Sequence, residues 1–324
     1  MKKISDYSAE AEMALRALKL SEKEPSSLYG PVDYALSSGG KRLRPGLVMM
    51  AAESFGGPAA LEAAGKPAAG IEMFHNFTLL HDDVMDNSEM RRGRESVWRK
   101  WDSSTAILSG DTMLTLATQL VSDVDDSKLR RVLEAFNHMA LEVYEGQRLD
   151  LDFEKTETVS SDTYIEMIRK KTGALLGAAA SIGALIGGAS DKDVAAMATY
   201  GEMLGIAFQI QDDWLDTYGD SATFGKPIGG DILNDKKTFL LVKAMEAEQG
   251  TVDALKVTMK ELKGEAKVKA VTRIYDKLNL NEVTRQAVSF YTKQALKALK
   301  GTSLSEELKE PFRLLVEKLT GRKK

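Results

Sequence analysis

Apolar residues recur at intervals of three and four along most of the chain, which is the period of an α-helix. Near the N-terminus they follow one face from Ile4 to Leu18, and near the other end from Val283 to Leu299. We find no persuasive run of alternating β-branched residues bounded by turn signals. The breaks are short, so the pattern predicts long helices joined by short loops. Ser303-Leu304-Ser305-Glu306 indicates a capping box that opens the last helix.

The organisation of the chain gives no sign of separate domains. Its 324 residues contain neither a clear shift in composition nor a low-complexity linker, so we predict one all-α domain over residues 1–324. One stretch imitates a membrane span, because residues 173–189 carry no charge. This stretch is at the short limit for crossing a bilayer, and its alanines and glycines make it only weakly hydrophobic. We therefore predict a buried core helix that lets its neighbours approach closely.

Composition excludes several classes of function. A net charge of −4 argues against a nucleic-acid-binding protein, in which basic residues should dominate. The absence of cysteine excludes disulfides, thiolate metal sites and a cysteine nucleophile. The chain starts with Met1-Lys2-Lys3 and lacks the apolar core of a signal peptide, so we expect a cytoplasmic protein without a transmembrane segment.

One short pattern occurs twice, as Asp82-Asp83-Val84-Met85-Asp86 and as Asp212-Asp213-Trp214-Leu215-Asp216. In each copy the first and last aspartates are four positions apart on a predicted helix, so they lie on one face about 6 Å apart. Two such faces turned towards each other would gather carboxylates whose repulsion is tolerable only with cations among them. Hard oxygen ligands favour magnesium, which bridges carboxylate to phosphate.

Basic residues accompany both aspartate motifs. Arg91-Arg92-Gly93 follows the first, and Gly225-Lys226-Pro227 with Asp231 and Lys236 follows the second. A third basic segment, Gly39-Gly40-Lys41-Arg42-Leu43-Arg44-Pro45, lies near the N-terminus. A single DDxxD would be an ordinary accident in a chain with 28% charged residues. Here both halves combine acidic residues that can hold a metal ion with basic residues that can bind phosphate. This combination predicts a magnesium–diphosphate site between two helices.

These motifs resemble those of the trans-isoprenyl diphosphate synthases, the polyprenyl synthetase family that includes farnesyl and geranylgeranyl diphosphate synthases. The resemblance runs from Gly39 to Lys236 and keeps the family's order of motifs. Between the aspartate motifs, Gly146-Gln147 with Asp150 and Lys171-Thr172-Gly173 stand in the expected places. The resemblance implies a single bundle of long helices around a central cavity, usually as a homodimer.

The resemblance also implies a reaction. An allylic diphosphate (dimethylallyl, geranyl or farnesyl) loses its diphosphate, and the allyl cation alkylates isopentenyl diphosphate before a proton leaves. Magnesium ions, three per active site, would stabilise the departing anion. The expected direct ligands are Asp82, Asp86 and Asp212. The aspartates expected to act through water are Asp83, Asp213 and Asp216.

The family pattern assigns the other polar residues to the two substrates. The expected contacts to the allylic diphosphate are Arg91, Lys171 and Lys226. The uncharged oxygens expected to face the developing cation are those of Thr172 and Gln209. The expected contacts to isopentenyl diphosphate are Lys41, Arg44 and Arg92, with His75 joining them by position and Lys236 as a further substrate contact. Without the resemblance, His75 would be interpreted as a structural histidine with its hydrogen bonds satisfied. His81 and His138 keep that structural interpretation even with the resemblance.

Product length depends in this family on the residues just before the first motif. The family's stops correspond here to Thr78 and Phe77, with Phe74 a possible lower barrier. Helix geometry alone would select Thr78, so the choice of Phe77 rests on the resemblance. One aromatic, the small Thr78 and no insertion in the motif resemble archaeal-type geranylgeranyl synthases. We therefore predict the twenty-carbon geranylgeranyl product, with fifteen-carbon farnesyl as the alternative.

Three rival interpretations remain to be weighed. A class I terpene cyclase usually carries an Asn/Ser/Glu-type second motif, whereas this chain has a second DDxxD. An HD-type phosphohydrolase, suggested by His81-Asp82, needs more histidine ligands than the three in this chain offer. A non-catalytic subunit of a heteromeric synthase tends to lose one aspartate motif, and both are intact here. Activity of the purified chain alone would separate the last interpretation from an active synthase.

Overall fold

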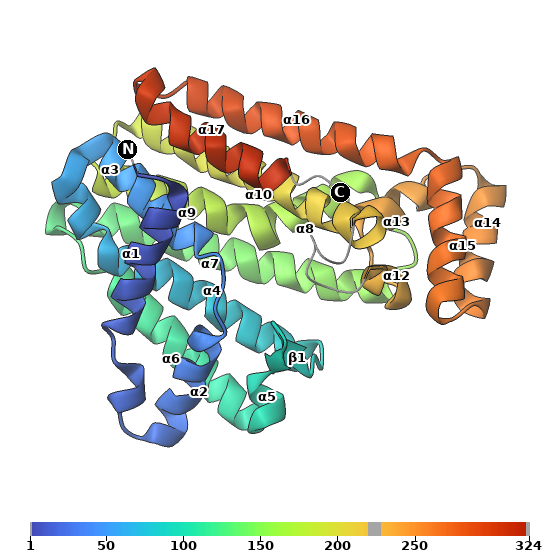
Figure 1. The fold of residues 1–324 in the computed structure, drawn as a ribbon, viewed down its shortest axis with the longest axis horizontal. Coiled ribbons are helices and arrows are strands. Elements are labelled where there is room, and N and C mark those ends of the chain that lie inside the picture. Colours follow the sequence, from blue (N-terminus) through green and yellow to red (C-terminus); the bar gives the residue numbers. More distant parts are fainter. Residues whose placement is uncertain (1, 220–227, 322–324) are drawn as a thin grey trace. The chain divides into compact units, whose positions relative to one another are not determined.

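The computed structural model describes residues 2–219 and 228–321. Figure 1 traces the helices from the N-terminus to the C-terminus, and they confirm the predicted all-α class. The chain divides into two compact units: Met1–His138, Ala178–Ala198 and Thr302–Pro311 form the first, and Met139–Gly177, Thr199–Gly301 and Phe312–Lys324 form the second. That residues 1–324 act as one domain stays a prediction.

The helices are assigned to the units as follows. The first unit contains α1 (Ile4–Arg16), the short 3-10 helix Leu20–Glu22, α2 (Ser26–Ser37), α3 (Leu43–Ala63), α4 (Gly65–Met85), α5 (Val97–Lys100) and α6 (Ser103–Val121). The second contains α8 (Ser161–Ile168), the π-helical segment Arg169–Gly173, α12 (Gly230–Leu233), α13 (Phe239–Met245), α14 (Gln249–Glu261), α15 (Gly264–Lys277) and α16 (Leu280–Lys300). Helices with residues in both units are α7 (Asp126–Lys155), α9 (Ala174–Ile186), α10 (Asp191–Tyr218) and α17 (Glu306–Thr320).

A small hairpin follows α4 and was not predicted. Its strands, β1 (Met90–Arg91) and β2 (Arg94–Glu95), pair antiparallel. The two residues between them, Arg92 and Gly93, both have positive φ, at 51° and 77°. Positive φ at both positions gives the turn that matches the twist of a hairpin. The strands are too short for the alternation that identifies a strand in a sequence.

One helix is kinked within its length, and one expected helix start was wrong. Gly56-Gly57-Pro58 kinks α3 without ending it, because Gly57 adopts φ 70° and Pro58 needs no backbone N–H at the start of the next helical turn. The last helix begins at Glu306, two residues later than a cap at Ser303 would place it. Ser305 supplies the cap by accepting from the Leu308 N–H at 3.3 Å, while Ser303 bonds to Asp193.

Helix α9 confirms the predicted buried helix, since all its residues from Ala174 to Ile186 are buried. In the first unit, Gly183 of α9 and Gly187, which directly follows the helix, meet α3 closely. A Cβ on Gly183 would lie 2.8 Å from the Ala51 Cβ, and one on Gly187 would lie 2.8 Å from the Ala52 carbonyl oxygen. No helix in the described residues is long and apolar enough to cross a membrane.

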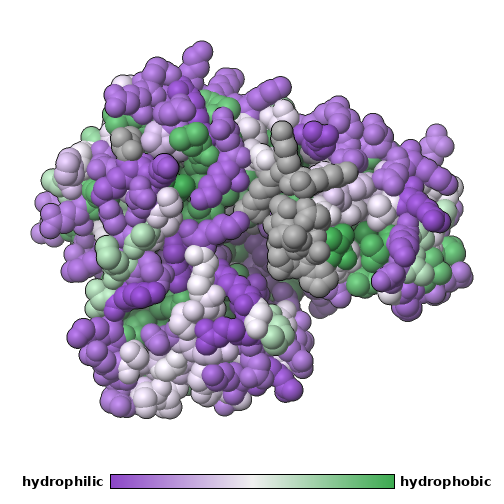
Figure 2. Space-filling view, viewed as in Figure 1, coloured by the Kyte–Doolittle hydropathy of each residue, from purple (hydrophilic) through white to green (hydrophobic). Residues whose placement is uncertain are grey.

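The core of the second unit is built from aromatic and aliphatic side chains of α8, α10 and α13. Tyr164, Ile206, Ile210 and Phe239 belong to one buried cluster. By contrast, hydrophilic residues cover most of the face seen in Figure 2. Polar groups that enter this core must find hydrogen-bond partners there, which matters for the second aspartate motif.

Candidate active site

The first aspartate motif occupies the C-terminal end of α4. Asp82 and Asp83 lie in its last turn, and Asp86 is the residue that caps it. Asp83 is buried and accepts from the Arg91 guanidinium, with Nε–Oδ1 2.9 Å and Nη2–Oδ1 2.5 Å. Burial nevertheless raises the pKa of Asp83 above its ordinary value. Asp82 is half-buried and Asp86 exposed, so the second aspartate turns into the protein.

The two neighbouring arginines of the hairpin go to different partners. Arg91, in β1, pairs with Asp83 as described. Arg92, in the left-handed conformation of the turn, donates to the carbonyl oxygen of Gly39 instead. The turn geometry therefore separates two adjacent cations, one towards the aspartate motif and one towards the basic N-terminal segment. Their assignment to different substrates stays a prediction.

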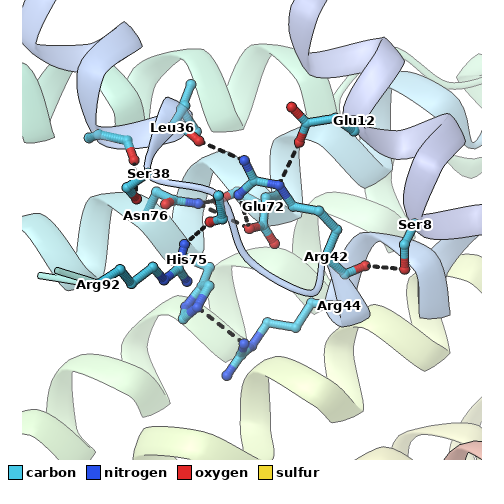
Figure 3. Close-up of polar contacts among 12 residues, drawn as sticks. Ser8, Glu12, Leu36, Ser38, Arg42, Arg44, Glu72, His75, Asn76 and Arg92 are labelled. Carbon is cyan, nitrogen blue, oxygen red and sulfur yellow. Dashed lines mark hydrogen bonds and ion pairs between the residues drawn. The ribbon is translucent and has the colours of Figure 1, made fainter. Parts of the chain in front are cut away.

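The basic segment meets α4 at His75 (Figure 3). The Arg44 Nη1 lies 3.1 Å from His75 Nε2. Burial, and then the charges of Arg44, Arg92, Arg91 and Arg42, hold the pKa of His75 well below its usual value. A neutral imidazole can accept a hydrogen bond from a guanidinium. His75 therefore acts here as an acceptor that orients Arg44.

Arg42 belongs to the basic N-terminal segment, and the sequence predicted no function for it. In the structure its side chain contacts three other parts of the first unit. Its guanidinium is buried, and it contacts Glu12, Glu72 and the carbonyl oxygen of Leu36. In Figure 3 these contacts lie beside the Arg44–His75 pair. Nothing in the sequence separates a buried arginine from its exposed neighbour Lys41, because both are polar and adjacent in one motif.

Lys171 and Thr172 lie in the π-helical segment Arg169–Gly173 of the second unit. The Lys171 Nζ pairs with Asp150 Oδ2 at 2.7 Å, and the Thr172 hydroxyl donates to Gln209 Oε1 at 3.2 Å. A Cβ at Gly146 of α7 would lie 2.8 Å from Lys171 Cα, so only glycine allows this approach. Among the described residues, both amide atoms of the neighbouring Gln147 are buried without a hydrogen-bond partner, so a bound substrate or water could supply one.

The second aspartate motif lies near the end of α10. Asp213 is buried and accepts from the Phe239 N–H at 2.9 Å, from Gln209 Nε2 at 3.1 Å and from the Tyr164 hydroxyl. Burial raises the pKa of Asp213 to about 7, although the hydrogen bonds from Phe239 and Tyr164 oppose the shift. Thr172, Gln209 and Asp213 thus form one chain of hydrogen bonds. Tyr164, which ends that chain, was missed because it is eight positions before Thr172 and carries no motif.

The last aspartate of this motif holds a turn. Asp216 Oδ2 accepts from the Asp231 N–H at 3.0 Å, and its carbonyl oxygen accepts from the Gly229 N–H at 2.6 Å. Lys236, five residues after Asp231, is exposed. Asp212 is half-buried. Lys226, expected to contact the allylic diphosphate, lies outside the described residues.

The donor set fits magnesium, since the motifs offer carboxylate oxygens and no sulfur. In residues 2–219 and 228–321, no three histidine or acidic side chains are grouped so that they could hold a metal ion by themselves. Asp83 and Asp213 are engaged by protein donors. That Asp82, Asp86 and Asp212 are the direct ligands stays a prediction.

The residues expected to limit product length lie on α4 before the motif. Phe74 is fully buried, with its ring 5.5 Å from that of Phe77 and 5.4 Å from that of Phe136. Phe77 is also buried and meets His81 edge to face. Thr78 is half-buried and donates to the His75 carbonyl oxygen at 2.8 Å. The His81 Nε2 lies 3.2 Å from the Ile107 carbonyl oxygen of α6, which suits the structural role expected for it.

Comparisons with known sequences identify the family. A model of the polyprenyl synthetase family matches residues 25–278. A geranylgeranyl diphosphate synthase of Methanosarcina mazei is 40% identical over 245 residues, which cover 75% of this chain and 75% of the relative. A geranylfarnesyl diphosphate synthase of Aeropyrum pernix is 34% identical over 310 residues, which cover 93% and 96%.

Solved structures agree. A crystal structure of a geranylgeranyl pyrophosphate synthase superposes with a TM-score of 0.93 at 40% identity and covers all of both chains. A geranylgeranyl pyrophosphate synthase of Corynebacterium glutamicum, complexed with isoprenyl diphosphate and magnesium, gives a TM-score of 0.85 at 27% identity and covers 99% and 98%. Both aspartate motifs, the basic segments and these likenesses lead to one conclusion: the chain is a member of the polyprenyl synthetase family.

Proposed function

We propose that this chain is a short-chain trans-prenyltransferase that condenses isopentenyl diphosphate with allylic diphosphates. The observation that carries the proposal is the duplicated DDxxD motif, each copy with its own basic residues, in a chain that belongs to this family. Family membership sets aside the terpene cyclase and phosphohydrolase interpretations. The twenty-carbon geranylgeranyl product is the one that relatives and the residues before the first motif favour together.

The residues of this chain would divide the work of the reaction. Asp82, Asp86 and Asp212 would hold magnesium, and the magnesium of a solved relative supports this. Magnesium, when bound, supplies Lewis-acid stabilisation of the departing diphosphate. Arg91, which lies beside the first motif through Asp83, would add positive charge at the same anion. We keep three ions per site as a prediction.

The hydrogen-bond chain from Thr172 through Gln209 to Asp213 would help to stabilise the allyl cation. The Thr172 hydroxyl donates to Gln209 Oε1, and the Gln209 amide donates to Asp213. This fixes the orientation of both uncharged oxygens before substrate arrives, and preorganised dipoles stabilise a developing charge without the cost of reorienting. The proton released at the end has no obvious side-chain base in this arrangement, and the departed diphosphate would accept it.

The test is product analysis with the purified chain alone. Dimethylallyl and isopentenyl diphosphates with magnesium should give geranylgeranyl diphosphate by chromatography, and chelation of the metal should abolish turnover. A product that ends at farnesyl would replace the geranylgeranyl assignment with the alternative. No turnover by the chain alone would favour the non-catalytic subunit of a heteromeric synthase.

The homodimer and the cytoplasmic location are further parts of this proposal. Helix α6 supports the dimer, because the apolar Ile107 and Leu108 are 47% and 59% exposed on a helix whose buried side packs against α4. Leu108→Glu should shift the protein from dimer to monomer in light scattering after size-exclusion chromatography. Leu314→Glu, at a similarly exposed position of α17, is the matched control and should leave the dimer intact. A wild-type monomer would contradict the proposal.

A further inference from the structure

Arg42 joins three helices of the first unit through one side chain. Its Nε donates to Glu12 of α1 at 2.7 Å, its Nη1 donates to Glu72 of α4 at 2.7 Å, and its Nη2 donates to the Leu36 carbonyl oxygen of α2 at 2.6 Å. Figure 3 shows the guanidinium between these partners, pointing away from Arg44. Each nitrogen of the guanidinium thus donates within the protein and the side chain is buried, which favours a structural role for Arg42 over direct contact with a substrate.

The carboxylates that bind Arg42 are fixed by further hydrogen bonds. Glu72 is only 2% exposed, and Asn76 Nδ2 donates to its Oε1 at 3.1 Å and to its carbonyl oxygen at 2.8 Å. Glu12 also accepts from Arg16 at 3.1 Å. A buried ion pair of this kind adds little net stability over well-packed apolar residues of similar volume. The main effect of the ion pair is therefore to fix the position of the Arg42 side chain and not to stabilise the fold.

The contacts of Arg42 constrain the backbone of segment 39–44. Arg42 is left-handed, at φ 46°, and follows Gly39 and Gly40 at φ 78° and 141°. A non-glycine residue pays a steric cost in this conformation and keeps it only where its surroundings require it. The carbonyl oxygen of Arg42 accepts from the Ser8 hydroxyl at 3.0 Å and from the Gly46 N–H at 3.1 Å, which fixes the start of α3.

The residues next to Arg42 are the cations expected to bind isopentenyl diphosphate. Lys41 precedes it, Arg44 follows two positions later, and Arg92 donates to the carbonyl oxygen of Gly39 in the same segment. We propose that Arg42, clamped by Glu72 and Glu12, is a positioning residue that holds segment 39–44 so that Lys41 and Arg44 meet the diphosphate of isopentenyl diphosphate. This inference rests on the proposed function.

Two conservative variants test it, and each keeps either the size or the charge of the side chain that it replaces. Glu72→Gln keeps the size of the side chain but removes the charge that holds Nη1, and Arg42→Lys keeps the charge but loses the fork. Initial rates are measured with each substrate varied in turn. Both variants should raise the Michaelis constant for isopentenyl diphosphate about tenfold, while that for the allylic substrate and the rate at saturation change less than twofold.

A double variant and a control separate positioning from stability. Arg42→Met with Glu72→Met replaces the pair by apolar side chains, so the fold should recover while the Michaelis constant for isopentenyl diphosphate stays high. Lys309→Met removes another buried cation, which pairs with Glu306 at 3.3 Å, and should leave both Michaelis constants unchanged. Calorimetry with isopentenyl diphosphate in chelator adds a binding readout that does not depend on turnover.

The outcomes distinguish this inference from the proposed function. An inactive wild-type chain would refute the function. An active wild type whose Glu72→Gln and Arg42→Lys variants keep the Michaelis constant for isopentenyl diphosphate would refute only the positioning role. Equal rises in the Michaelis constants for both substrates would also refute the positioning role, because they would indicate a general loosening of the fold and not a specific effect on isopentenyl diphosphate. Tighter binding in Glu72→Gln would show that Arg42 contacts the substrate itself.

Discussion

The close approach of α7 to the π-helical segment makes Gly146→Ala a sensitive probe of the second unit. The added Cβ would lie 2.8 Å from Lys171 Cα and 2.9 Å from the Lys170 carbonyl carbon, whereas ordinary contact begins at 3.4 Å. The atoms in the way belong to the backbone, so no side chain can swing aside. The segment that carries Lys171 and Thr172 must therefore move by at least about half an ångström.

The size of the effect follows from two opposing terms. Alanine improves helix propensity over glycine by about 1 kcal/mol. Overpacking a close contact costs about 1–3 kcal/mol. The net loss of stability should therefore be small, between about 0 and 2 kcal/mol. Catalysis is more demanding, because a displacement of about 1 Å can lower a rate about 100-fold. We expect the turnover number to fall by about 10- to 100-fold in a folded protein.

The assay compares turnover and urea unfolding for the same preparations. Gly250→Ala of α14 is the matched control, because no atom lies within 4 Å of the added Cβ. It should keep the wild-type rate and gain a little stability from helix propensity. If Gly146→Ala turned over at the wild-type rate with unchanged stability, the backbone contact would not position Lys171 and Thr172, and the reasoning would be refuted.

Three more predictions concern α4. Asp82→Ala should lower turnover by orders of magnitude while circular dichroism still shows a folded helical protein; near-wild-type rates would remove it from the metal site. Phe77→Ala should lengthen the product seen by chromatography, and an unchanged length would exclude Phe77 as the stop. The lowered pKa of His75 means that the folded protein favours neutral imidazole. Its contribution to stability is present above pH 6.5 and lost as pH falls below it. Wild type should therefore lose stability relative to His75→Gln between pH 7.5 and 5.5 in urea unfolding, and parallel curves would contradict this.

The sequence predicted what depends on periodicity and on charge in a motif. The all-α class, the buried helix of residues 173–189 and the placement of both aspartate motifs on helices came from such patterns. That Arg91 and Arg92 have different partners agrees with their different assignments, which came from the family resemblance and not from the sequence pattern. That one joins Asp83 and the other joins Gly39 depends on a turn that long-range packing selects.

What the sequence did not predict depends on contacts between distant residues. Arg42 is separated from Glu72 and from Glu12 by thirty positions each, and periodicity says nothing about such pairs. Tyr164 reaches Asp213 across forty-nine positions. The π-helical turn at Lys171 has no propensity signature of its own. In each case tertiary packing, and not local preference, decides the arrangement.

The close contacts that Gly183 of α9 and the following Gly187 make with α3 have a practical consequence for random mutagenesis of this protein. Gly183 and Gly187 meet α3 so closely that any larger side chain would collide with backbone or Cβ atoms. A library that samples every position evenly would lose most members mutated there to misfolding before selection. Gly183 and Gly187 should therefore be held constant in library design. Diversity can be placed on α4 at Thr78, which is half-buried and whose side chain can change in size.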